Sequence, residues 1–492
     1  MKTLITILLT LAGGASAFAQ YAYEPSPKGT IPSDSIPYSA LPDTASLTLA
    51  PLPEGERMPL PQSWGFSRQY NQSLPSEDEW WRTFDDPVLN SLIRQAESSN
   101  FNLAAALRRM QIARRTEQQA KAAYFPTIGA QAGYNLERAS GATTSQLMRN
   151  PDLNYLSLGL TASWEIDLFG RVGAQVKSAK ADQMLAKADY DAAMVSLCAQ
   201  LAKSYVQLRL YQAELLVATE HVHSQEKVVE MTQARMDAGL APKLDVLQAQ
   251  VVLSSTQATL PTLEAMIKTQ IGSIATLLGT YADSIAPLLE EPAPLPNCFQ
   301  NPAVGTPMEL LRRRPDIAQA EATLAADAAA IGIAKKDFLP TLTLEGQVGV
   351  SAHKPGDLFK NQAFTYSVAP TLSWTIFDGL ARNYRVAAAR EQMEADIDAY
   401  NQTIVSALQE VDNAATTYDG YIHSLSFQDR LVAQSREALD LAVSLYRSTL
   451  ASFTNVVDAQ MNLLEYENSR LQTRANALLS LISLYESLGG GF

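Results

Sequence analysis

The stretch "FPTIGAQAGYNL", residues 125–136, alternates between apolar and polar side chains from Thr127 onward, unlike the chain around it. Its even positions form one apolar series and its odd positions one polar series: Ile128, Ala130, Ala132, Tyr134 and Leu136 against Thr127, Gly129, Gln131, Gly133 and Asn135. A period of two is typical of a β-strand with one apolar face. The rest of the chain is largely polar, alanine-rich helix by pattern, so this strand raises the question of what its apolar face touches.

The first residues and the composition set the compartment. The chain has 492 residues, of which 47% are hydrophobic, and its net charge of −13 argues against a nucleic-acid partner. Residues 1–19 combine Lys2, an apolar run and Ala17-Phe18-Ala19, which predicts a signal peptide cleaved before Gln20. An uncleaved N-terminal anchor is the alternative. Beyond residue 20 we find no apolar run of about 18 residues, so a membrane crossing would require β-structure.

Residues that could carry chemistry are sparse. Cys198 and Cys298 do not have the spacing of metal ligands. They are either two thiols buried in the core or the two halves of one disulfide, and the sequence leaves both alternatives open. The histidines are expected on the surface, as polar residues and without a metal; they are His221, His223, His353 and His423. No glycine-rich phosphate loop or nucleophile motif occurs in the sequence. We therefore expect no enzyme, no cofactor and no metal site.

The chain repeats itself. Trp164 in "LTASWEIDLFGR" matches Trp374 in "APTLSWTIFDGLAR" 210 positions later, and "AYFPT" at 123–127 matches "DFLPT" at 337–341. Each repeat runs helix, strand, loop, strand, very long helix, short break, long helix. The four predicted strands cover about residues 127–136, 154–168, 341–350 and 363–377, and all four alternate.

Strands of about 10 residues with one apolar face have the length of tilted membrane-spanning strands. A soluble four-stranded sheet packed on helices would alternate in the same way, so the pattern alone leaves both open. Trp164 and Trp374, near the strand ends, fit a membrane-interface girdle or a buried core. Because about eight strands are the fewest that close a barrel, lipid-facing strands of this chain would have to share a barrel with other copies. Three copies would supply twelve strands.

The predicted helices are unusually long. From Gly170 to about Asp237, and from about Leu380 to Arg447, the chain carries no proline, which predicts helices about 100 Å long. Each is followed by a returning helix with apolar residues at heptad spacing, so the arms should lie along partner helices. The two series are Val246, Leu253, Leu260, Ile267, Ile274 and Tyr281, and Val457, Leu464, Leu471, Leu478 and Tyr485. Pro261 predicts a kink in the first returning helix.

Several long segments resemble one family. "RRRPDIAQAEATLAADAAAIGIAKKDFLPTLTLEG" (312–346) and "WWRTFDDPVLNSLIRQAESSNFNLAAALRRMQIAR" (80–114) are similar to the TolC-type outer-membrane efflux channels, in the OprM-like branch that serves resistance-nodulation-division (RND) pumps. The resemblance covers about residues 76–488. It implies a homotrimer with a 12-stranded barrel in the outer membrane, an α-helical barrel in the periplasm, and no enzymatic activity. The implied role is the exit duct of a tripartite efflux pump, with a periplasmic adaptor protein and an inner-membrane pump as partners.

The resemblance also assigns residues at the two helical tips, Arg235–Asp245 and Tyr446–Asp458. It implies a closing network and constriction formed by Tyr446, Arg447 and Asp458, with Asn455 where some relatives carry a second carboxylate. It implies adaptor contacts at Ala238, Gly239, Leu240, Thr449 and Leu450. Thr449 replaces a common glycine, so adaptor contact is better supported at the first tip. Gln20 stands where many relatives carry a lipid-modified cysteine, and we expect no acyl anchor.

Physical chemistry gives Asp458 a role consistent with that assignment. Three copies of an axis-facing carboxylate repel one another unless they are hydrated, protonated or bound to a cation, and such a ring favours cations. A solvated acid near a helix end is the alternative.

The expected organisation is as follows: signal peptide 1–19, extended Pro-rich segment 20–75, first repeat 76–279, connector 280–307, second repeat 308–488, and tail 489–492. Two other functions stay open. One is the outer-membrane channel of a type I secretion or metal-export system. The other is a non-conducting periplasmic coiled-coil scaffold.

Overall fold

The computed structural model describes residues 79–138, 152–296, 302, 304, 306–307 and 313–490, all within one unit, Ala50–Phe492. The predicted signal peptide, nearly all of the Pro-rich segment, Cys298 and part of the connector lie outside these residues. In chain order the elements are η4 (Trp80–Phe84), α2 (Pro87–Ser99), α3 (Phe101–Ala122), β1 (Thr127–Arg138), β2 (Asp152–Ile166), α4 (Arg171–Asp237), α5 (Lys243–Leu277), α6 (Ala282–Leu289), α8 (Pro315–Lys336), β3 (Thr341–Ala352), η5 (Pro355–Asp357), η6 (Asn361–Ala363), β4 (Phe364–Ser373), α9 (Ala381–Arg447) and α10 (Phe453–Ser487).

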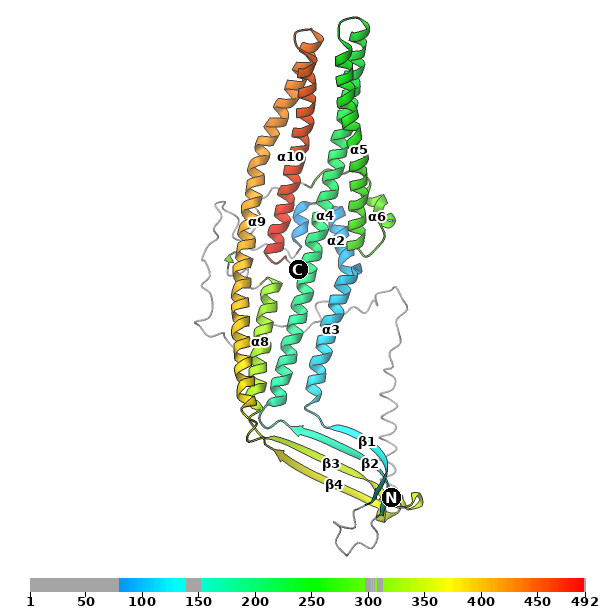
Figure 1. Ribbon diagram of the computed structural model, residues 1–492, viewed down its shortest axis with the longest axis vertical. Coiled ribbons are helices and arrows are strands. Elements are labelled where there is room, and N and C mark those ends of the chain that lie inside the picture. Colours follow the sequence, from blue (N-terminus) through cyan, green and yellow to red (C-terminus); the bar gives the residue numbers. More distant parts are fainter. Residues whose placement is uncertain are drawn as a thin grey trace. The chain divides into compact units, whose positions relative to one another are not determined.

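The helices next to the sheet follow the order of the strands. The sheet has the order β1-β2-β3-β4, and α3, α4, α8 and α9 pack side by side in the corresponding order (Figure 1). Each strand therefore connects to the helix on its own side of the array, which keeps every connection short. The outermost helices of this half are α3 and α9.

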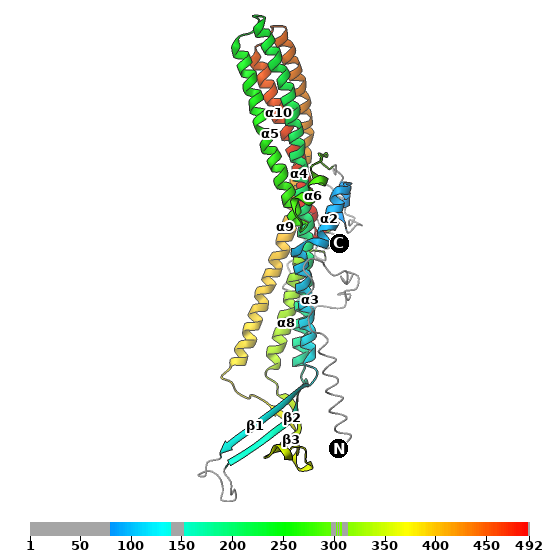
Figure 2. The ribbon, with the colours of Figure 1, turned by 90° about the vertical axis from the view of Figure 1, so that its right-hand side faces the viewer.

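The other half consists of two helical hairpins. Helices α4 and α5 form the first hairpin, α9 and α10 form the second, and α10 packs against α4 between them. Both hairpins end on the side away from the sheet, as two views show (Figures 1 and 2). Helices α4 and α9 are each 67 residues long, so each spans about 100 Å at 1.5 Å per residue.

The register of the sheet sorts its residues by parity. Even-numbered residues pair with even-numbered residues across all three antiparallel interfaces, as in Ala130↔Leu160, Leu160↔Val348 and Val348↔Tyr366. One face is therefore mainly apolar and the other mainly polar. The apolar face carries Ile128, Ala130, Ala132, Tyr134, Leu136, Leu156, Leu158, Leu160, Ala162, Trp164, Ile166, Leu342, Leu344, Val348, Val350, Phe364, Tyr366, Val368 and Leu372.

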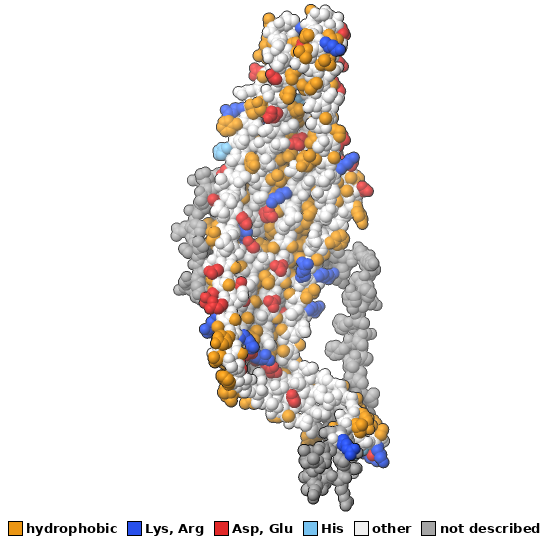
Figure 3. Space-filling view, in the orientation of Figure 1, with side chains coloured by type: hydrophobic (Ala, Val, Ile, Leu, Met, Phe, Trp, Pro, Cys, Tyr) orange, Lys and Arg blue, Asp and Glu red, His pale blue; other side chains and the backbone are white. Residues whose placement is uncertain are grey.

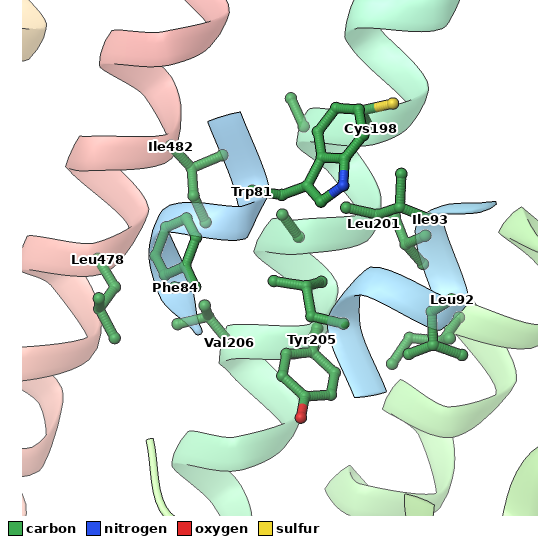
Figure 4. Packing of buried hydrophobic residues seen from close by; sticks show 14 of the residues in the cluster. Trp81, Phe84, Leu92, Ile93, Cys198, Leu201, Tyr205, Val206, Leu478 and Ile482 are labelled. Atoms are coloured by element: carbon green, nitrogen blue, oxygen red, sulfur yellow. The ribbon is translucent and has the colours of Figure 1, made fainter. Parts of the chain in front are cut away.

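The main core lies at mid-length, where η4 and α2 pack on α4 and α10. Trp81 (2% exposed) and Phe84 lie against Cys198, Leu201 and Ile482 in this cluster (Figure 4). Burial of each large apolar side chain in this cluster stabilises the folded chain by roughly 1.5–3 kcal/mol.

Asp86 both starts α2 and fixes its position. One carboxylate oxygen accepts bonds from the amides of Val88 and Leu89, at 2.9 and 3.1 Å, and so caps the helix. The other accepts a 2.7 Å bond from the hydroxyl of Tyr205 on α4. The cap therefore ties α2 to the long helix.

Helix α8 corrects one sequence expectation. Among the described helices it alone has the length and composition of a possible membrane span, with a mean hydropathy of 1.2 over 18 residues. Much of that hydropathy comes from alanines that are interspersed with polar residues, so the segment contains no long uninterrupted apolar run. In the structure α8 packs between α4 and α9, and Ile317 and Leu324 join a small core with Ile404.

Two further expectations need adjustment. The second and fourth strands end at Ile166 and Ser373, earlier than predicted, because the chain then turns toward α4 and α9. The heptad series on α10 is only partly buried, and in its first half the buried apolar residues include Val456 and Leu463, each one position before the predicted residue. The coarser prediction, a mainly helical chain with a small antiparallel sheet, is confirmed.

Candidate functional site

The sheet exposes its apolar face. On β4, Tyr366, Val368 and Leu372 are 75%, 68% and 64% exposed, although each is large and apolar. Within the described residues no α-helix packs closely on the sheet; the strands make their main contacts with one another, and the short helix η6 touches β3. A contiguous exposed apolar surface of this kind marks a contact with lipid or with another protein.

The two tryptophans predicted at the interface occupy equivalent places in the repeats. The indole N–H of Trp164 donates a 3.0 Å bond to the carbonyl of Tyr124, and that of Trp374 donates a 2.9 Å bond to the carbonyl of Phe338. Each bond ties the end of a strand to the residues that follow the preceding helix. The polar edge of each ring is therefore satisfied while its apolar body remains partly accessible.

Apolar side chains gather where the sheet joins the helices. Between β4 and the first turn of α9, the exposed residues are Trp374, Ile376, Phe377, Leu380 and Tyr384, each at least half exposed. Figure 3 shows hydrophobic side chains concentrated at this end of α9. A band of exposed aromatic residues of this kind is typical of a membrane–water interface.

At the other end of the molecule, the two hairpin tips share one backbone design. The amide of Leu240 donates to the carbonyl of Arg235 at 2.8 Å, and the amide of Leu450 donates to that of Leu445 at 2.9 Å. Gly239 takes the left-handed conformation in the first tip, with φ of 73°, and Thr449 takes it in the second, with φ of 60°. Glycine adopts this conformation freely, whereas threonine does so with strain.

A compact network joins the two tips within one chain. Tyr446 is 4% exposed, and its hydroxyl donates a 2.8 Å bond to Oδ2 of Asp245 at the start of α5. The guanidinium of Arg235 lies 4.8 Å from the centre of the Tyr446 ring and donates a 2.7 Å bond to the carbonyl of Arg447. Phe453 completes the packing, with its ring centre 5.1 Å from that of Tyr446.

The acidic partner and the burial fix the protonation of the tyrosine. Burial, followed by the hydrogen bond to Asp245, raises the pKa of Tyr446 to about 12. The phenol therefore stays protonated and acts as a donor throughout the physiological range.

The other predicted tip residues lie apart from this network. Asn455 and Asp458 are exposed on α10, and the side chain of Arg447 is exposed while its backbone carbonyl joins the network. The sequence reasoning missed Arg235 and Asp245 as partners of Tyr446, although both ends of the first tip range carry them. The sequence clue to these partners was that a charged residue flanks the first tip on each side, while the second tip begins with a tyrosine.

His221 corrects the expectation of surface histidines. It is 7% exposed, and its Nε2 lies 2.7 Å from Oε2 of Glu467, which joins α4 to α10. Arg436 on α9 binds the other carboxylate oxygen at 2.5 Å. Burial opposes the charged carboxylate, but the bonds from His221 and Arg436 outweigh it and lower the pKa of Glu467.

Cys198 is a buried free thiol, and burial raises its pKa to about 12. It therefore packs as a small core residue rather than as a reactive group. Within the described residues, no group of three His, Cys, Asp or Glu side chains could hold a metal ion.

The comparisons with known proteins agree with this architecture. A family model described as "Outer membrane efflux protein" matches residues 92–280 and 306–490. The pyoverdine export outer membrane protein OpmQ of Pseudomonas aeruginosa is 30% identical over 461 residues, covering 90% of this chain and 94% of that protein.

Solved structures show the same fold. The outer-membrane channel OprN superposes with a TM-score of 0.82 at 33% identity, over 88% of this chain and 98% of that one. The outer membrane protein VceC of Vibrio cholerae superposes with a TM-score of 0.78 at 26% identity, over 85% and 100%. The resemblance stated from the sequence is confirmed, and the family consists of channel proteins rather than enzymes. Because the family model matches both repeats over most of the chain, the chain belongs to the outer membrane efflux protein family, whose members reside in the outer membrane.

Proposed function

We propose that three copies of this chain form one passive duct, which serves as the outer-membrane exit of a tripartite efflux pump. Each copy contributes four strands to a twelve-stranded barrel and its hairpins to a helical tube on the periplasmic side. The single observation that carries the proposal is the four-stranded sheet, with one apolar and one polar face and with two edges that no described strand pairs with.

The unpaired edges require another copy. Among the described strands, β1 and β4 each pair on only one side, and backbone groups cannot remain unpaired in lipid. β1 runs away from the helices and β4 runs toward them, so β1 of one copy pairs antiparallel with β4 of the next. Closing the ring in this way directs the apolar face to lipid and the polar face to a water-filled interior.

The network at the tips supports a periplasmic gate. Tyr446, Asp245 and Arg235 help to hold the second hairpin against the first, and Asp458 and Asn455 are exposed on α10 outside this network. Around a threefold axis, three copies of Asp458 form an acidic ring that favours cations over anions. Each of these hydrogen bonds and charge contacts is weak by itself, which suits a gate that a partner must open.

The partners follow from the same arrangement. A periplasmic adaptor protein docks on the tip residues Ala238, Gly239, Leu240, Thr449 and Leu450, and an inner-membrane pump of the RND type supplies the substrate. Leu240 and Leu450 are 63% and 76% exposed at these tips, which offers an apolar contact surface. The relative OpmQ is named for pyoverdine export, and this chain's exported compounds are set by its own pump.

Neighbouring residues of β4 provide the experiment. Val368 lies on the apolar face and Ser367 on the polar face, and both are exposed in the single chain. Val368→Lys places a charge in lipid, at a cost of about 2–4 kcal/mol near the bilayer centre. We expect it to reduce the trimeric, detergent-requiring membrane fraction severalfold. Ser367→Lys should integrate normally and lower the cation preference of the channel in planar bilayers.

The wild-type protein must itself behave as a trimeric channel in this experiment. A stable single-chain species in mild detergent, or release of the wild-type protein by a carbonate wash, would contradict the proposal. Equal behaviour of the two lysine variants would contradict the assignment of the two faces.

A further inference from the structure

The two outermost helices next to the sheet have opposite charge patterns on their free faces. α3 packs on α4 through Leu103, Ala106 and Met110, and α9 packs on α8 through Ile397, Tyr400 and Ile404. At 3.6 residues per turn, the face of each helix opposite these contacts points away from the rest of the chain. The residues named below on these two faces are exposed in the described part of the chain, although the ring of Phe101 also lies near Gly279.

The free face of α3 is basic with apolar residues between the charges. It carries Arg108 and Arg115, seven positions apart, together with Phe101 (72% exposed) and Ile112 (64% exposed). The two guanidiniums donate to Gln111 and Gln118 one turn further on, at 3.0 and 2.9 Å. These partners are neutral, and neither arginine forms an ion pair with a described residue. These residues share one stripe because a spacing of seven returns to the same face of a helix.

The free face of α9 is the acidic counterpart. It carries Glu391 and Asp398, also seven positions apart and both exposed, with Ala395 between them. Val405, another seven positions along, is 38% exposed. The stripe therefore presents two acids and one apolar residue at the same spacing as the two arginines and Phe101 on α3.

The positions along the two helices also correspond. α3 ends, and α9 begins, at the sheet, so the two free faces would meet antiparallel. Arg115, Arg108 and Phe101 lie 7, 14 and 21 positions before the last residue of α3. Glu391, Asp398 and Val405 lie 10, 17 and 24 positions after the first residue of α9. The offset is the same at all three levels and corresponds to less than one helical turn.

We propose that the basic stripe of α3 is the recognition surface for the acidic stripe of α9 on a second copy of this chain. Arg115 then faces Glu391, Arg108 faces Asp398, and Phe101 packs on Val405, while the small Ala395 leaves room for Ile112. Exposed ion pairs contribute little binding energy, so the apolar contacts supply affinity and the charges select partner and register. This inference rests on the proposed trimer and adds the rule by which its copies join.

Disulfide cross-linking tests the register. In a background with Cys298→Ser and with Cys198 left in the core, Arg115→Cys combined with Glu391→Cys should give covalent dimers and trimers in membranes under mild oxidation. The control pair Arg108→Cys with Glu391→Cys is out of register by one heptad, about 10 Å along the helix, and should cross-link at least tenfold less. Cross-linking of the control pair at the same yield, or of neither pair in trimeric protein, would overturn the register.

Charge exchange tests the recognition. Arg108→Glu with Arg115→Glu should raise the monomer fraction in mild detergent at least tenfold, as should Glu391→Arg with Asp398→Arg. Combining all four changes should restore the trimer to within about threefold of wild type, because opposite charges again face each other. Arg109→Glu is the matched control, since Arg109 lies on the side of α3 and should leave the trimer intact.

The outcomes separate this inference from the proposed function. Suppose that the wild-type protein is trimeric and conducts, but the reversed variants match wild type or the four changes fail to restore the trimer. The proposed contact between α3 and α9 is then wrong, whereas the proposed channel is not contradicted. If the wild-type protein forms neither trimers nor channels, both proposals fall.

Discussion

The hydroxyl of Tyr446 donates a 2.8 Å hydrogen bond to Asp245 and thereby joins the second hairpin of the chain to the first. The two residues lie 201 positions apart, in different repeats, so the bond is a tertiary contact between the two hairpins. An apolar cluster joins the same hairpins beside it, with Val228 and Ala249 packed against Tyr446. Arg235 covers the tyrosine ring at 4.8 Å and adds a further link between the same hairpins. The position of one tip relative to the other therefore depends on these polar contacts together with the apolar packing around Tyr446.

Removing the hydroxyl should loosen the closed tips. Tyr446→Phe keeps the packing against Phe453 but deletes the bond to Asp245, which costs about 1–2 kcal/mol and leaves the carboxylate without this donor. We expect a severalfold rise in conductance in planar bilayers. The control is Tyr384→Phe, because Tyr384 is 69% exposed and lies at the other end of α9. An unchanged conductance for Tyr446→Phe would remove this bond from the gate.

Asp458 provides a separate prediction about the pore. It is exposed on α10, outside the contacts that join the two tips, so its replacement should leave the chain folded. If three copies line the axis, Asp458→Ala should raise single-channel conductance or weaken block by divalent cations. Asp440→Ala, an exposed acid on α9, serves as the comparison. Equal cation block in wild type and Asp458→Ala would place Asp458 away from the constriction.

The sheet and the long helices follow from local patterns in the sequence. Alternation in the stretch after Pro126 predicts the first strand, and the same parity in the other strands leads to even residues pairing with even residues. The absence of proline after Gly170 and after Leu380 predicts two helices of equal length, and both are found. These features were predictable because one local rule determines each of them.

Contacts between the repeats could not be predicted in this way. The buried stripe at the start of α10 includes Gln460 and Glu467, which a search for apolar heptads passes over. Glu467 is buried because His221 and Arg436 meet it, and these partners lie 246 and 31 positions away. The pairing of Tyr446 with Asp245 has the same origin. Single-sequence patterns carry no information about which distant polar groups satisfy one another.

The tips differ in one residue that should change their local stability. Thr449 and Gly239 occupy equivalent left-handed positions, with φ of 60° and 73°. Thr449→Gly should stabilise the second tip by about 1 kcal/mol, and Gly239→Ala should destabilise the first by a similar amount. Hydrogen exchange at the amides of Leu450 and Leu240, which close the two turns, measures both effects. Slower exchange at Leu240 in Gly239→Ala would contradict the strain argument.

A carboxyl pair between α8 and α9 should make stability depend on pH. Burial, followed by the neighbouring Asp396, raises the pKa of Asp327 to about 6. An acid with a raised pKa binds its proton more tightly in the folded state, so the free energy of unfolding should fall as pH rises from about 4 to about 6. Asp327→Asn removes the repulsion and should stabilise the protein by about 1 kcal/mol at pH ~8, after allowance for solvent screening, with little gain at pH ~5.

Thermal unfolding of the detergent-solubilised protein at the two pH values checks this prediction. Asp396→Asn should reproduce the effect of Asp327→Asn, and the double variant should gain little more, because a single interaction is removed in each case. Glu394→Gln, at an exposed position on α9, is the matched control and should leave the pH dependence unchanged. If Asp327→Asn increased the stability equally at both pH values, the effect would come from packing between α8 and α9 and not from proton binding by Asp327 and Asp396.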